Sequence, residues 1–119
     1  MNYLAHIHMA HVSQTSLVGN FLGDFVKGSD LTRFPHELQT GIRLHRAIDS
    51  YTDSHPVISQ LREHFPPALR RMSGIIIDVY FDHLLCRHWS RIESTQLEHV
   101  LAKFYAEINT TNVQLNSRF

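Results

Sequence analysis

Two stretches of this sequence determine its fold: residues 45–55, which read HRAIDSYTDSH, and residues 78–83, which read DVYFDH. In each stretch, carboxylate and imidazole side chains recur four residues apart among apolar residues. Residues four apart lie on one face of an α-helix, so the spacing predicts two helices whose polar side chains can reach one metal ion. Asp78 also follows an apolar run, Gly74–Ile77, that suits a core. A carboxylate there needs a partner, because burying an unpaired charge is costly.

The rest of the chain also favours helices, and no alternation of apolar and polar residues indicates a strand. Ser13 or Thr15 is the expected N-cap of the second helix, and Gly28 its end. The helix over 68–91 should bury Ile75, Ile76, Val79, Leu84 and Trp89. We therefore predict an all-α compact bundle that forms a single domain over residues 1–119, with a polar tail after 108 and with helices over 2–11, 15–27, 35–54, 57–64, 68–91 and 95–108.

The composition sets limits on function. Hydrophobic residues make up 43% and charged residues 18% of the 119 positions, as in globular proteins. A formal net charge of zero argues against a nucleic-acid partner. Because no apolar run approaches the roughly 20 residues of a bilayer span and no signal peptide opens the chain, we expect no membrane partner and a cytoplasmic location. The single cysteine, Cys86, excludes a cysteine zinc site and should pack as a small hydrophobe.

The first candidate site lies on the predicted helix over 35–54. His45, Asp49 and Asp53 form a line of residues four apart, with Arg46 beside it. A solvated polar face explains this line equally well when the helix is considered alone. Because apolar residues flank the line and His55 follows it, a site at the edge of a buried stripe is the preferred interpretation.

The second candidate site lies on the predicted long helix. Asp78 and Asp82 are one turn apart, and His83 lies at the edge of the same face. Two such carboxylates repel each other unless a cation lies between them. The alternative is an aspartate pair neutralised by nearby arginines. Asp24, within the apolar segment 19–25, adds a third carboxylate, although this signal is weak alone.

Histidine is abundant, with ten in the chain, and it is a common metal ligand. Either His6 or His8 can supply a further ligand, but a hydrogen-bonded core histidine is the preferred interpretation for both. Carboxylates with imidazoles and no thiolate suit Mn²⁺, Mg²⁺ or Fe²⁺ better than structural zinc. Such sites activate water and neutralise phosphate oxygens, so the pattern indicates a phosphoester hydrolase.

Four segments carry a family resemblance. Residues 1–8 (MNYLAHIH) and 19–28 (GNFLGDFVKG) resemble the opening of acyl carrier protein phosphodiesterases. Residues 41–56 (GIRLHRAIDSYTDSHP) and 74–89 resemble the two signature helices of that family. The resemblance implies a helical fold distantly like that of the HD-domain phosphohydrolases, Mn²⁺ or a similar ion, and removal of the 4′-phosphopantetheine arm from acyl carrier protein.

The resemblance also suggests roles for individual residues. The positions that match the family motifs, and so the expected metal ligands, are Asp24, His45, Asp49, Asp78, Asp82 and His83. An uncommitted carboxylate or His83 would act as the general base, and Arg43, Arg46 or Arg87 would offset charge on the phosphoryl oxygens. The expected catalytic set is Asp24, His45, Asp49, Arg46 and His83. The acidic carrier would dock on an arginine rim formed by Arg33, Arg62, Arg70 and Arg71.

Two other functions are compatible with the residues. A hydrolase of nucleotides or small phosphoesters would use the same metal site without a docking surface. A non-catalytic helical module derived from the enzyme would need no metal. Members of the family generally continue well beyond 119 residues, so we expect missing C-terminal helices. The exposed core surface would then favour a homo-oligomer, lower stability or lost activity.

Overall fold

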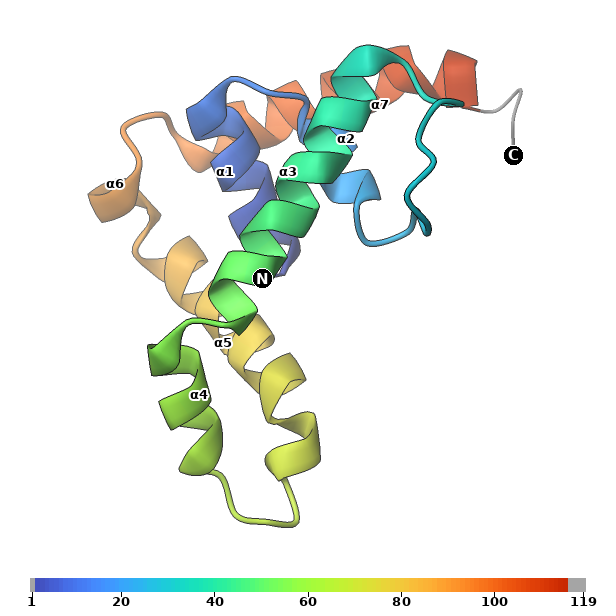
Figure 1. The fold of residues 1–119 in the computed structure, drawn as a ribbon. Coiled ribbons are helices and arrows are strands. Elements are labelled where there is room, and N and C mark those ends of the chain that lie inside the picture. The colour runs from blue at the N-terminus through green and yellow to red at the C-terminus, as the bar shows by residue number, and fades with distance from the viewer. Residues whose placement is uncertain (1, 116–119) are drawn as a thin grey trace.

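A computed structural model describes the backbone of residues 2–115 and the side chains of residues 2–111. All regular structure in this range is helical, which confirms the all-α prediction (Figure 1). The elements are α1 (Tyr3–Ser13), α2 (Leu17–Leu22), α3 (His36–Asp53), α4 (Pro56–Glu63), the 3₁₀ helix η1 (Arg70–Met72), α5 (Ser73–Arg87), α6 (Trp89–Ile92) and α7 (Leu97–Leu115).

The core lies where α1, α2, α3 and α7 meet. Ala10, Ile42 and Val100, which come from three of these helices, have no exposed surface. Trp89 joins this core, and its indole nitrogen donates a hydrogen bond to the Thr95 carbonyl oxygen at 2.8 Å. Burial of a side chain as large as Ile42 or Val100 contributes about 1.5–3 kcal/mol.

Helices α2 and α3 cross closely because two glycines face each other. A Cβ added to Gly41 would lie 2.8 Å from the Gly19 backbone, which is closer than real Cβ contacts occur. The helices therefore approach to a distance that no larger residue at position 41 allows. This contact fixes the end of α2, and with it Asp24, against the middle of α3.

Helices α4 and α5 form an arm that projects away from the core (Figure 1). The arm is attached to α1 through Asp82, whose two carboxylate oxygens accept the backbone N–H groups of Leu4 and Ala5 at 3.0 and 3.1 Å. These are two of the amides that a helix N-terminus leaves without an intrahelical partner. A side chain of α5 therefore caps α1.

The predicted burial on α5 is largely wrong. Ile75 and Val79 are 64% and 56% exposed, Ile76 is exposed as well, and Leu84 is half-buried. Trp89 is buried as predicted. The exposed residues lie on the arm. Helix α5 meets the core through its contacts with α1 and through Leu85, and the chain after it meets the core through Trp89. Cys86 is exposed too, contrary to its expected role as a buried hydrophobe.

Several helix boundaries also differ from prediction. Helix α2 ends at Leu22 rather than at residue 27, and its N-cap is Ser16, whose hydroxyl accepts the Gly19 N–H at 2.8 Å. The predicted helix over 68–91 is divided into η1, α5 and α6, because the backbone leaves helical geometry at His88 and turns Trp89 into the core. Helix α7 extends to Leu115 rather than to residue 108. Among the described residues, no helix is long and apolar enough to cross a bilayer.

Candidate metal and phosphoester site

Two buried imidazoles and one carboxylate form the centre of the candidate site. His6 on α1 and His45 on α3 are 1% and 3% exposed, and their rings stack with centroids 3.7 Å apart. The Nε2 atom of His6 lies 2.9 Å from Asp49 Oδ1, and that of His45 lies 3.1 Å from Asp49 Oδ2. Their ligand atoms all lie within 4.8 Å of one another, so these three residues can hold one metal ion.

A second carboxylate joins this centre from the turn after α2. Asp24 Oδ1 lies 3.2 Å from His45 Nε2, so that nitrogen faces two carboxylates. The preceding Gly23 permits this approach, because a Cβ added there would overlap the His45 side chain. A neutral imidazole has only one Nε2 proton, which cannot form a full hydrogen bond with both Asp24 and Asp49. A cation bound near Nε2 could instead interact with the imidazole and with both carboxylates.

The protonation of the centre also suits a metal. Burial lowers the pKa of His6, and the adjacent His45 lowers it further, so His6 is neutral at pH 7 as a metal ligand must be. Burial opposes ionisation of Asp49, but neighbouring charges and donors, His6 and His45 among them, outweigh it and the pKa of Asp49 lies below its ordinary value. The Nδ1 atoms of both imidazoles are buried and make no hydrogen bond within the described residues, so their polar interactions are all through Nε2.

A cavity of about 250 Å³ adjoins the centre and is rich in carboxylates. Asp24, Asp49, Asp53 and Asp78 line it, together with Asn2 and the side chains of Ile75 and Val79. Burial raises the pKa of Asp78, and the charges of Asp53 and Asp49 add to this effect. Carboxylates from α3, α5 and the α2–α3 connection thus face one space, where a hard divalent cation would relieve their repulsion.

The structure brings together four of the six residues that the sequence suggested as metal ligands: Asp24, His45 and Asp49 at the centre, with Asp78 across the cavity. It places Asp82 at the N-terminus of α1. His83 is exposed beside Tyr80, and it lines a different, apolar cavity. Arg46 donates a hydrogen bond to the Val26 carbonyl oxygen at 3.2 Å and so fixes the loop before α3.

His6 joins the candidate site, although its sequence favours a core histidine over a ligand. It is indeed a buried core histidine, but it also faces Asp49 across 43 residues of sequence. No carboxylate lies one turn away from it on α1, so local spacing carries no signal. The remaining signal is an imidazole between the apolar residues Ala5 and Ile7, because such a group, once buried, requires a polar partner from elsewhere in the fold.

Comparisons with known proteins identify the family. The family model described as acyl carrier protein phosphodiesterase matches residues 1–119. The chain belongs to the acyl carrier protein phosphodiesterase family. A member from Pectobacterium atrosepticum is 41% identical over 120 residues, which cover all of this chain and 62% of that relative. A member from Salmonella agona is 47% identical over 92 residues, which cover 77% of this chain and 48% of that relative.

The match to these relatives is partial in length. This chain spans 62%, 58% and 48% of the relatives from Pectobacterium atrosepticum, Salmonella dublin and Salmonella agona, each of which is described as an acyl carrier protein phosphodiesterase. No solved structure is significantly similar to the chain. The likeness to HD-domain enzymes therefore stays a prediction.

Proposed function

We propose that this chain hydrolyses the phosphodiester that joins a 4′-phosphopantetheine arm to an acyl carrier protein, with the help of a divalent metal ion. The observation that supports this proposal is the convergence of two buried Nε2 atoms on Asp49, with Asp24 beside them. Membership of the phosphodiesterase family supports the substrate class.

His6, His45 and Asp49 would hold the metal, and Asp24 lies close enough to His45 to join them. Two imidazoles among oxygen ligands favour Mn²⁺ or Fe²⁺ over Mg²⁺, and Mn²⁺ is the proposed ion. When bound, such an ion lowers the pKa of a coordinated water and neutralises phosphate oxygens. The buried histidines exclude bulk water on the α1–α3 side of the centre.

Asp78 is the proposed general base. It lines the cavity beside the centre, and its raised pKa makes it a better proton acceptor than an ordinary aspartate. It would take a proton from the attacking water as the new oxygen–phosphorus bond forms. The phosphorus–oxygen bond to the carrier serine breaks, the serine oxygen takes a proton from solvent water, and Asp78 returns its proton to solvent. The products are apo-carrier and 4′-phosphopantetheine.

Docking of the acidic carrier is assigned to three of the four arginines that the sequence suggested. Arg70 and Arg71 on η1 are exposed, and Arg62 on α4 lies near them, because its Nε atom donates to the Ser73 hydroxyl at 3.0 Å. Arg33 precedes α3, whereas α4 follows it. The 18 residues of α3 separate the two positions by roughly 27 Å, so Arg33 lies outside this arginine rim.

The test is conversion of holo-carrier to apo-carrier, followed by mass spectrometry, with chelated protein and with added Mn²⁺. We expect activity only with the metal, and we expect His45→Gln to abolish it. His99→Gln, which changes an exposed histidine on α7, is the matched control and should keep full activity. Turnover by chelated protein, or by His45→Gln, would refute the metal-dependent mechanism.

A hydrolase of small phosphoesters is the alternative that the same assay can separate. Arg71→Glu should lower the turnover of holo-carrier, because it places a like charge before an acidic partner. It should leave the hydrolysis of bis(4-nitrophenyl) phosphate unchanged. Equal effects on both substrates would favour the small-phosphoester function.

A further inference from the structure

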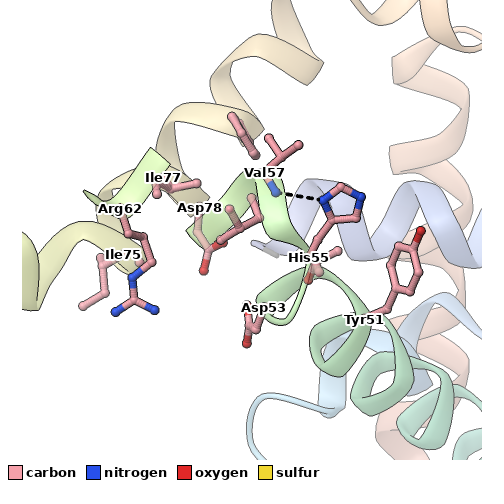
Figure 2. A pocket seen from close by; sticks show the side chains of 12 residues that line it. Tyr51, Asp53, His55, Val57, Arg62, Ile75, Ile77 and Asp78 are labelled. Atoms are coloured by element: carbon pink, nitrogen blue, oxygen red, sulfur yellow. Dashed lines mark hydrogen bonds between the residues drawn. The ribbon is translucent and has the colours of Figure 1, made fainter. Parts of the chain in front are cut away.

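A second cavity, of about 510 Å³, lies between the end of α3, α4 and the start of α5 (Figure 2). Its walls are mainly apolar and include Val57, Ile77 and Phe81. It shares Asp53 and Asp78 with the carboxylate cavity beside the histidines. The two cavities are therefore neighbours, and they meet at Asp53, Ile75 and Asp78.

The apolar walls are unusually accessible. Val57 is 51% and Phe81 is 41% exposed, although their neighbour Ile77 is buried. Contiguous exposed apolar side chains mark ligand grooves or interfaces more often than inert surface. An apolar group bound between α4 and α5 would cover them.

Polar side chains lie on both sides of the two shared carboxylates Asp53 and Asp78 in this cavity (Figure 2). On one side, His55 Nδ1 accepts the N–H of Val57 at 3.2 Å, which leaves the proton of the neutral ring on Nε2 as a free donor. The Tyr51 ring lies 5.9 Å from the His55 ring and adds a hydroxyl. Arg62 lies on the other side. The cavity thus offers donors beside an apolar wall.

We propose that this cavity binds the pantetheine portion of the prosthetic group, an inference that rests on the function proposed above. Pantetheine is an uncharged chain of about 20 non-hydrogen atoms, and pockets of about 300–1,000 Å³ hold ligands of that size. Its geminal methyl and methylene groups match Val57, Ile77 and Phe81, and its amide carbonyls match the His55 and Tyr51 donors. The phosphate end lies where Asp53 and Asp78 border both cavities.

The first experiment fills the cavity and compares two substrates. Val57→Trp should raise KM for holo-carrier at least tenfold, because the indole occupies the space of the arm. Hydrolysis of bis(4-nitrophenyl) phosphate, which has no such arm, should change less than twofold. Phe81→Ala removes apolar contact with the arm instead. It should raise KM for holo-carrier about fourfold for each methylene group of the arm that loses its contact. Val12→Trp, which changes an equally exposed valine on α1, is the matched control.

Each other outcome of this comparison would overturn the proposal. An unchanged KM for holo-carrier in Val57→Trp would show that the arm does not use the cavity. Equal losses on both substrates would show that the change acts on the metal centre. Light scattering at the assay concentration tests a competing occupant: a dimer that Val57→Trp dissociates would assign the cavity to a second copy of this chain.

A binding experiment separates this inference from the proposed function. Free pantetheine, which has no phosphate, is titrated into chelated protein while the methyl resonances of the isoleucines are followed by NMR. We expect saturable shifts at Ile75 and Ile77, and their loss in Val57→Trp. Binding without any turnover of holo-carrier by the metal-loaded chain would refute the proposed function and retain the cavity. Turnover without these shifts would refute the cavity and retain the function.

Discussion

Replacing Asp82 tests whether this aspartate is a cap of α1 or a metal ligand. In the structure its carboxylate accepts the N–H groups of Leu4 and Ala5, and Asp82→Ala leaves both amides without these acceptors. Loss of a capping acceptor costs about 0.5–2 kcal/mol, and hydrogen bonds to a charged group are worth about 1.5–3 kcal/mol. Because the bonds are only partly buried, we expect a loss of about 2–3 kcal/mol. For a chain of this length, that corresponds to a fall in Tm of about 8–12 °C.

Two measurements on the same samples decide between the roles. Calorimetry gives Tm of the chelated protein, and titration calorimetry gives the Mn²⁺ affinity. Asp82→Asn keeps one acceptor oxygen and should lose roughly half as much stability as Asp82→Ala, with Mn²⁺ affinity within about threefold of the parent chain. Cys86→Ser, one turn further along α5 and exposed, should change neither quantity. A Mn²⁺ affinity lowered tenfold or more in Asp82→Asn, at an unchanged Tm, would refute the cap and restore the ligand role.

Three further results are expected. Gly23→Ala should lower Mn²⁺ affinity at least tenfold in a calorimetric titration, because the added Cβ displaces His45. The control is Gly28→Ala, which lies in open space at φ 84°. It should cost only about 1 kcal/mol of stability and leave the Mn²⁺ affinity unchanged. Mn²⁺ at one hundred times its Kd should stabilise the chain by about 2.7 kcal/mol in thermal melts, and Asp49→Asn should abolish that gain. The Thr95 backbone N–H and the His8 side chain lower the pKa of Glu93 to about 2, so its stabilising effect is complete above about pH 4.5 and is lost as the pH falls toward 2. Melts from pH 7 to pH 2 should therefore show that Glu93→Gln differs from the parent chain at pH 7 and converges with it in acid; a constant difference would contradict this assignment.

The sequence predicted helix boundaries well where proline residues mark both ends of the helix. The helix between Pro35 and Pro56 is found within one residue at its start and its end, because proline restricts both its own φ angle and the residue before it. The i, i+4 spacing did not predict the role of a side chain where a contact with another helix determines that role. The i, i+4 pair Asp78 and Asp82 shares a face, yet one member lines the carboxylate cavity and the other caps a different helix.

Burial of α5 was not predictable from its sequence for a related reason. An apolar run such as 74–77 indicates which residues of a helix can be buried, but it does not indicate which other helix packs against them. Ile77 lines the cavity between α3, α4 and α5 and is buried, while Ile75, two residues earlier on the arm, is exposed. The hydrophobic pattern therefore identified the buried face of this helix correctly only in part.

Helix α1 links these observations physically. Its His6 meets Asp49 of α3, its N-terminal amides bind Asp82 of α5, and its His8 lies 3.2 Å from Glu93. His6, a candidate metal ligand, is therefore placed by a helix that three other segments hold in position. Because α5 carries Asp78 as well as Asp82, the contact that caps α1 also sets the distance of Asp78 from the histidines. The position of Asp78 therefore depends on the docking of α5, and a change that releases α5 from α1 should lower turnover through Asp78 even where the histidine centre keeps its affinity for Mn²⁺.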